Sequence, residues 1–200
     1  MDLTISNEEL VVCLAERYNL SFPKYPPLVT YNEWLYGVWL IGNDYRNMSG
    51  GYYGAYPRSL LKRYGCMFGD FDKVLHLFSG SLPKSVAYTR FDIQGDTDVK
   101  GDALRLSNCF EKDSFDIIFA DPPYSKKDAE KYGTGMPNRL AVMNQIFHIL
   151  NPGGLVIWLD TSFPMYKKKF FKLLATIGIV RSTNHRVRCV FIFRKHHTTS

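Results

Sequence analysis

The residues with the clearest chemical meaning form the tetrad Asp121-Pro122-Pro123-Tyr124, which directly follows the apolar run 115–120. Because proline fixes φ and has no N–H group, the prolines should hold this loop rigid with its carbonyl groups facing outward. A carboxylate and a carbonyl could then accept both N–H groups of an exocyclic amine, free the nitrogen lone pair for attack and stabilise the developing positive charge. Tyr124 could stack on an extracted base. The tetrad therefore predicts chemistry at an amino group of a nucleic-acid base.

A second group of residues points to a nucleoside cofactor. Gly80 and Asp92 stand, like Asp121, at the ends of predicted strands, and Asp102 adds a further position of this kind. In an open parallel sheet, ligands bind beside the carboxyl ends of the strands. A glycine there allows close approach of the backbone, and an acid can accept hydrogen bonds from ribose hydroxyls. We therefore expect Asp92 to hold the ribose and Asp102 to hold the adenine amino group.

The elements that must position these residues alternate between strand and helix, which indicates a mostly parallel sheet. Ser6 opens a first helix with a capping box. Residues 31–41 fit either state, and the glycine- and tyrosine-rich residues 43–56 predict a loop. Residues 179–182 and 187–193 predict an antiparallel hairpin. The other predicted strands are residues 74–78, 86–93, 103–106, 115–120 and 155–159, and the other predicted helices are residues 57–64, 138–150 and 165–177.

These residues and their order resemble the class I S-adenosylmethionine-dependent methyltransferases. The tetrad resembles the D/N/S-P-P-Y/F/W motif of the DNA amino-methyltransferases, which modify adenine N6 or cytosine N4. Residues 74–81 resemble their cofactor motif, an apolar strand ending in F-x-G-x-G, with Leu82 replacing the second glycine. Residues 151–154 resemble the turn before the fifth strand. The resemblance covers residues 50–194 and is strongest to adenine-N6 enzymes, because Asp opens the tetrad.

The resemblance implies an α/β, Rossmann-like methyltransferase fold. Its mostly parallel seven-stranded sheet would have the order 3-2-1-4-5-7-6 and end in a C-terminal antiparallel hairpin. We expect one domain over residues 1–200, with a helical and loop extension at 1–56 and the core at 57–195. The implied cofactor is S-adenosyl-L-methionine, and the implied catalytic residues are Asp121, Pro122, Pro123 and Tyr124. The implied cofactor-binding residues are Tyr56, Pro57, Phe78, Gly80, Asp92, Asp102, Ala103 and Asp121.

Charge and composition bear on the partner and the compartment. The chain carries a net charge of +6 and has a pI of about 9.1, which favours a polyanionic partner without requiring one. Lys126, Lys127 and Lys131 follow the tetrad and could contact phosphates that flank the target. The resemblance makes DNA the preferred partner and RNA a further candidate. The four cysteines lack metal-ligand spacing, so no metal is expected. With neither a signal peptide nor a membrane-spanning run in the sequence, we expect a cytoplasmic protein.

Several functional readings stay open at this point. The sequence contains no target-recognition domain, so specificity would come from short loops, a partner protein or a homodimer. Because a target-recognition domain is missing, guanine-N2 methylation of RNA is a credible alternative to DNA methylation. Two further alternatives are methylation of a protein amide and a non-catalytic cofactor-binding module. The replacement of a motif glycine by Leu82 is the best support for the non-catalytic module. His76 is expected to be a packed histidine rather than a catalytic base.

Overall fold

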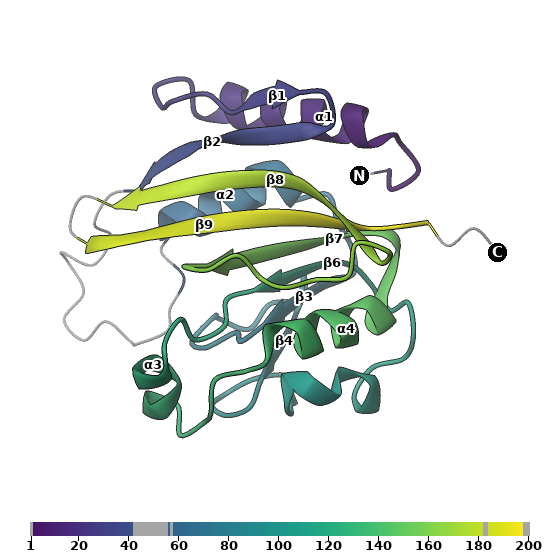
Figure 1. The fold of residues 1–200 in the computed structure, drawn as a ribbon, viewed down its shortest axis with the longest axis vertical. Coiled ribbons are helices and arrows are strands. Elements are labelled where there is room, and N and C mark those ends of the chain that lie inside the picture. The colour runs from purple at the N-terminus through teal and green to yellow at the C-terminus, as the bar shows by residue number, and fades with distance from the viewer. Residues whose placement is uncertain (1, 42–55, 57, 182–183, 198–200) are drawn as a thin grey trace.

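The computed structural model spans residues 1–200 and describes residues 2–41, 56, 58–181 and 184–197. Its described strands form one nine-stranded mixed sheet, shown in Figure 1, in the order β1-β2-β8-β9-β7-β6-β3-β4-β5. The strands are β1 (Val29–Tyr31), β2 (Trp34–Ile41), β3 (Val74–Leu77), β4 (Thr89–Asp92), β5 (Val99–Lys100), β6 (Phe115–Ala120), β7 (Leu150–Asp160), β8 (Phe171–Arg181) and β9 (Asn184–Lys195). The helices are α1 (Asn7–Ser21), α2 (Arg58–Phe68), α3 (Lys126–Lys131), α4 (Arg139–Ile149) and the 3₁₀ helix η1 (Ala103–Asn108).

Seven adjacent strands reproduce the predicted Rossmann-like order. From β5 to β8 they run β5-β4-β3-β6-β7-β9-β8, which is 3-2-1-4-5-7-6 in the numbering of that core. Within this core β9 is antiparallel to both β7 and β8, as the predicted C-terminal hairpin requires, and the other pairs are parallel. The structure therefore has the sheet topology of a class I methyltransferase.

The expectation of a seven-stranded sheet is wrong, because residues 29–41 add two strands at one edge. β2 pairs in parallel with β8, with Leu35 beside Ala175, and β1 pairs antiparallel with β2. Alternate side chains of β2, including those of Leu35 and Trp39, are buried. The N-terminal segment thus contributes a helix and two strands of the sheet, and the predicted loop residues 43–55 lie outside the described part of the chain.

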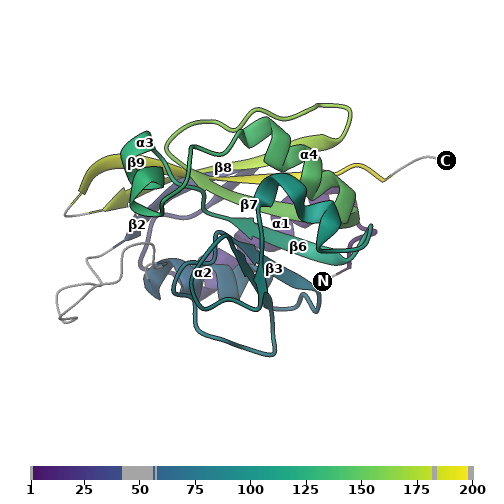
Figure 2. The same cartoon turned by 90° about the horizontal axis from the view of Figure 1, so that it is seen from below.

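Helices cover both faces of the sheet, as Figure 2 shows, with α1 and α2 on one side and α4 on the other. β6 illustrates how one strand serves both cores. Its Ile117 and Phe119 pack into the core that includes α1 and α2, whereas Ile118 and Ala120 pack into the core that includes α4. Such a strand is buried on both faces, which explains why the sequence of β6 is a nearly continuous apolar run.

Local sequence signals predicted several boundaries correctly. The structure places a strand over residues 115–120, as expected. Ser6 caps α1 with the predicted reciprocal bonds, because its hydroxyl accepts from the amide of Glu9 and the carboxylate of Glu9 accepts from the amide of Ser6. Asn138 caps α4 by accepting from the amide of Ala141 at 3.1 Å. A helix cap depends on residues three positions apart, and β6 is marked by a continuous apolar run, so both signals can be identified in the local sequence.

Two predicted elements are wrong. No helix forms over residues 165–177, since β8 begins at Phe171 and is buried along most of its length. A short apolar run with some lysines fits an amphipathic helix and a buried strand equally well, and pairing with β2 and β9 decides the state. The strand predicted at 103–106 is the 3₁₀ helix η1, and the third strand of the core is β5. In addition, α2 runs through Gly65 to Phe68 instead of ending near residue 64.

An ion pair links the last residue of β7 to the first residue of α4. Asp160, the last residue of β7, is fully buried and accepts from Nε of Arg139 at 2.6 Å and from Nη2 at 3.1 Å. The same carboxylate accepts from the indole N–H of Trp158 and from the amides of Thr161 and Ser162. The two guanidinium nitrogens, the indole and the two amides therefore share the Asp160 carboxylate as their acceptor.

None of the helices in the described residues has both the length and the apolar character of a membrane-spanning segment.

The Asp160→Ala variant should lower the free energy of unfolding by about 3–5 kcal/mol, because it leaves the guanidinium of Arg139 and the indole N–H without their acceptor. Urea unfolding followed by circular dichroism would measure this loss. Asp72→Ala is the matched control, since Asp72 is exposed and its loss should change stability by less than about 0.5 kcal/mol. Equal stability of the two variants would contradict the role given to Asp160.

Candidate active site

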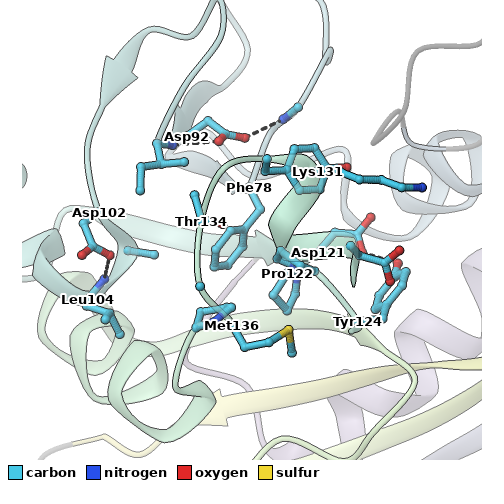
Figure 3. A pocket seen from close by; sticks show the side chains of 18 of the residues that line it. Phe78, Asp92, Asp102, Leu104, Asp121, Pro122, Tyr124, Lys131, Thr134 and Met136 are labelled. Carbon is cyan, nitrogen blue, oxygen red and sulfur yellow. Dashed lines mark hydrogen bonds between the residues drawn. The ribbon is translucent and has the colours of Figure 1, made fainter. Parts of the chain in front are cut away.

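A cavity of about 750 Å³ opens beside the carboxyl ends of β3, β4 and β6. It brings together most of the residues that the sequence singled out, as Figure 3 shows for a subset of them. Its size lies within the range of small-molecule and cofactor sites. The predicted site residues that line it are Phe78, Gly80, Asp92, Asp102, Ala103, Asp121, Pro122, Pro123, Tyr124, Lys127 and Lys131.

The loop after β3 is held in an unusual backbone conformation at the cavity wall. Phe78 and Gly80 both have positive φ, at 58° and 53°. Glycine adopts this region freely, but a bulky residue such as Phe rarely does, and such strain persists only where the surroundings impose it. Here the carboxylate of Asp92 accepts from the amide of Gly80 at 2.9 Å and so ties the loop to the end of β4. The backbone is thereby shaped before any ligand binds.

The two carboxylates expected to contact the cofactor are both positioned by backbone amides. Asp92 also accepts from the amide of Ile93 at 2.7 Å, and Asp102 accepts from the amide of Leu104 at 2.9 Å as the cap of η1. A carboxylate oxygen has two lone pairs, so each group retains acceptor capacity toward the cavity that it lines. These acceptors suit the hydroxyl and amino donors of a nucleoside.

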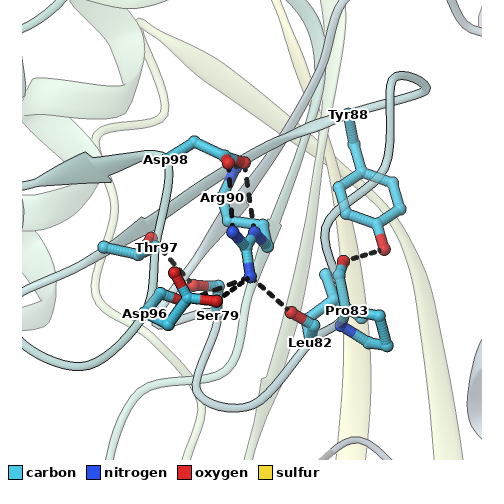
Figure 4. Close-up of polar contacts among 8 residues, drawn as sticks. All are labelled: Ser79, Leu82, Pro83, Tyr88, Arg90, Asp96, Thr97 and Asp98. Carbon is cyan, nitrogen blue, oxygen red and sulfur yellow. Dashed lines mark hydrogen bonds and ion pairs between the residues drawn. The ribbon is translucent and has the colours of Figure 1, made fainter.

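A buried arginine, which the sequence analysis did not identify, organises the segment between β3 and β4 (Figure 4). Arg90 donates from Nε and Nη2 to the carboxylate of Asp98, each at 3.1 Å, and these bonds lower the pKa of Asp98. It also donates from Nη1 to the carbonyl oxygens of Leu82 and Asp96. Leu82, which replaces a motif glycine, is itself buried and is not among the residues that line the cavity. Its side chain therefore leaves the cofactor side of the cavity open.

Asp121 has the most unusual electrostatic environment in the cavity. Burial raises the pKa of this carboxyl to about 6, and the charge of Asp160 adds to the increase, while Tyr124 and Arg188 oppose it. The hydroxyl of Tyr124 donates a hydrogen bond to Oδ1 of Asp121. In a desolvated site such a carboxylate is a stronger hydrogen-bond acceptor than it would be in water.

Tyr124 is held from its other side by Arg188 of β9. The guanidinium carbon lies 4.8 Å from the centroid of the tyrosine ring, and Nη1 lies 3.4 Å from the hydroxyl oxygen. Burial is the main reason that the pKa of Tyr124 is raised well above its ordinary value, followed by the negative charge of Asp121. The phenol therefore stays protonated and donates to Asp121.

Arg139 and Asp160, which the sequence analysis missed, form an ion pair that contacts the tetrad. Nη2 of Arg139 lies 3.5 Å from the carbonyl oxygen of Pro123 and simultaneously binds the buried Asp160. Asp160 directly follows the predicted strand 155–159, so the rule that selected Asp92 and Asp121 could have selected it as well. No sequence signal identified Arg139, because its partner is 21 positions away in the chain.

Tyr56 lies behind the tetrad in a buried aromatic cluster, and its pKa is raised by burial first and then by the charge of Asp121. Its ring makes an edge contact with His76, with centroids 5.7 Å apart. His76 in turn stacks on Phe119 at 4.6 Å, and burial lowers its pKa to about 4. A neutral, packed histidine outside the cavity is not positioned as a catalytic base. Pro57 lies outside the described residues.

The three lysines after the tetrad do not share one position. Lys127 and Lys131 line the cavity from α3, whereas Lys126 is exposed and is not among the lining residues. The loop after α3 completes this wall with Thr134, Gly135 and Met136. Within the described part of the chain, no group of three or more His, Cys, Asp or Glu side chains could hold a metal ion.

No protein-family model matches the chain. A demethylmenaquinone methyltransferase from Lactococcus lactis is 36% identical over 76 residues, which cover 36% of this chain and 25% of that protein. The chain therefore matches about a quarter of the length of this curated relative.

Two solved structures are similar in outline. The CurJ carbon methyltransferase has a TM-score of 0.41 and 11% identity, with 69% of this chain and 53% of that chain covered. The PH0226 protein from Pyrococcus horikoshii OT3 has a TM-score of 0.39 and 15% identity, with 68% of this chain and 86% of that chain covered. Sheet order and sequence similarity together relate this chain to the class I methyltransferases, and the similarity to methyltransferases implies S-adenosylmethionine as the cofactor.

Proposed function

We propose that this chain is an S-adenosylmethionine-dependent methyltransferase that modifies an exocyclic amino group of a nucleic-acid base, with adenine N6 in DNA as the first candidate. The observation that carries the proposal is the convergence of two residue sets in one cavity. Gly80, Asp92 and Asp102 form a nucleoside side, and Asp121 to Tyr124 form an acceptor side. A methyl donor and an amine could therefore meet within the same cavity.

The chain's own residues account for binding and orientation. S-adenosylmethionine supplies an electrophilic methyl group when it is bound, and its ribose and adenine match the acceptor oxygens of Asp92 and Asp102. The ionised carboxylate of Asp121 accepts an N–H of the amine and can take the proton that the nitrogen loses after methylation. Asp121 can accept the amine with lone pairs that the Tyr124 hydroxyl does not use, and the ring of Tyr124 could stack on the base.

A second candidate is methylation of a carbon atom in a small aromatic molecule. It is favoured by the name of the Lactococcus lactis relative, a demethylmenaquinone methyltransferase. Cytosine N4, guanine N2 in RNA and a protein amide remain alternatives that share the amine chemistry of the tetrad. A non-catalytic cofactor-binding module is the remaining alternative.

One assay separates these candidates. The protein is incubated with S-adenosylmethionine carrying a labelled methyl group and, in separate reactions, with mixed-sequence DNA, total RNA, cell protein or demethylmenaquinol. Label in DNA, located on adenine N6 by nucleoside analysis, is the expected result. Label confined to RNA, protein or quinol would identify that molecule as the acceptor in place of DNA. No label in any reaction, with S-adenosylmethionine still bound, would favour the non-catalytic cofactor-binding module, and undetectable cofactor binding would rule out the proposed enzyme.

The Asp121→Ala variant should lower kcat by about 10²–10³-fold, because it removes an acceptor that stabilises charge in the transition state. Its affinity for S-adenosylhomocysteine, measured by calorimetry, should stay within about twofold of the wild-type value, since Asp92 and Asp102 are unchanged. Asp72→Ala serves as the exposed control and should keep both values. Wild-type turnover in the Asp121→Ala variant would refute the role of this carboxylate.

Activity should also fall in acid with a midpoint near pH 6. The pKa of Asp121 is raised to about 6, so the carboxylate is ionised above that pH and protonated below it, and only the ionised form accepts the amine N–H. The kcat/KM measured between pH 4.5 and 8.5, which reports the ligand-free enzyme, should therefore rise about tenfold per pH unit below pH 6 and level off above pH 7. A plateau that extends below pH 5 would show that another group controls the reaction.

A further inference from the structure

Arg188 is a cation in the wall of the cavity without a carboxylate partner in the described part of the chain. It lies on β9, is half-buried and lines the cavity close to Tyr124. Its printed contacts are the face of the Tyr124 ring at 4.8 Å and the Tyr124 hydroxyl at 3.4 Å. The Nε atom is buried and finds no hydrogen-bond partner among the described residues. Arg139, which does not line the cavity, by contrast forms an ion pair with Asp160 through two of its nitrogens.

The donors of Arg188 that lack a protein acceptor would be satisfied by a ligand that supplies acceptor oxygens. A guanidinium has five N–H donors in a planar fork that matches two oxygens of a phosphate. Arg188 is half-buried, and although its charge lowers the pKa of Asp121, it forms no salt bridge among the described residues. Its contact with Tyr124 uses only one donor at a long distance. The free donors therefore suit an anionic group that arrives with the ligand.

The position of Arg188 selects the acceptor side of the cavity. The guanidinium contacts Tyr124, which itself bonds to Asp121, whereas the nucleoside side is formed by Gly80, Asp92 and Asp102. Lys127 and Lys131 line the same cavity and add positive charge. An anion held here would thus belong to the molecule that brings the amine.

We propose that Arg188 is the phosphate-binding residue of the acceptor site and holds a phosphate that flanks the target base. The inference rests on the proposed function and narrows its substrate class, because it requires a nucleotide rather than a free base or nucleoside. Arg188 also covers one face of the Tyr124 ring. A base that stacks on that face displaces the guanidinium, and the phosphate of the same nucleotide gives it a new partner.

Calorimetry on the wild-type protein saturated with S-adenosylhomocysteine tests this proposal. The probes are the four deoxynucleosides and the four deoxynucleoside 3′,5′-bisphosphates, at equal ionic strength. The bisphosphate of the target base should bind at least about tenfold more tightly than its nucleoside, as expected for charge-assisted hydrogen bonds. In Arg188→Gln this ratio should fall to within about twofold, and Arg188→Lys should keep part of it. Lys62→Gln, on the exposed surface of α2, should keep the wild-type ratio.

The outcomes distinguish this inference from the proposed function. A full phosphate preference in Arg188→Gln overturns the role of Arg188 and leaves the proposed function intact. If the wild-type protein binds S-adenosylhomocysteine but none of the nucleotides, the proposed function fails and the inference fails with it. If Arg188→Lys loses S-adenosylhomocysteine binding while its thermal unfolding temperature is unchanged, the arginine serves the cofactor, which also overturns the inference.

Discussion

In the parallel pairs of the central sheet, Leu77 of β3 lies beside Ala120 of β6, and Ala120 lies beside Trp158 of β7. This register fixes where the chain leaves the sheet. The Phe78 loop, Asp121 and Asp160 therefore all lie at the carboxyl ends of the parallel strands. The strands themselves are buried on both faces and cannot shift by one residue without moving apolar side chains out of their cores. The geometry of the cavity thus depends on the pairing of strands that contribute almost no side chains to it.

Three carboxylates near this edge differ in how fully they are satisfied. Asp160 accepts from two guanidinium donors, an indole and two backbone amides, so it anchors structure. Asp92 accepts from backbone amides and keeps spare lone pairs, as a binding group would. Asp121 is enclosed and contacts one neutral donor, the Tyr124 hydroxyl, in the described residues. Burial is the main cause of its raised pKa, and an incoming amine can supply the donors that the described residues do not.

The sequence predicted those features that depend on neighbouring residues. The end of β6, the cap of α1, the start of α4 and the positions of Gly80 and Asp92 all follow from local patterns. The state of β8 was predicted wrongly, because its burial is provided by β2 and β9 from distant parts of the chain. The same limit applies to the supports of the site: Arg188 lies 64 residues from Tyr124 in sequence, and only the folded sheet brings them together.

The residues of the tetrad bear on whether the acceptor is methylated at nitrogen or at carbon. A quinol acceptor would offer O–H donors to this carboxylate, and its ring carbon must lose a proton after methylation, although a carbon nucleophile itself has no N–H donor. An amine supplies that donor, and its developing positive charge is stabilised by the same carboxylate. With a pKa of about 6, Asp121 is ionised at neutral pH and is still basic enough to take the departing proton. The carboxylate therefore suits an amine, as the proposed function requires, and it also suits the removal of a ring proton from a quinol, the acceptor class suggested by the name of the curated relative.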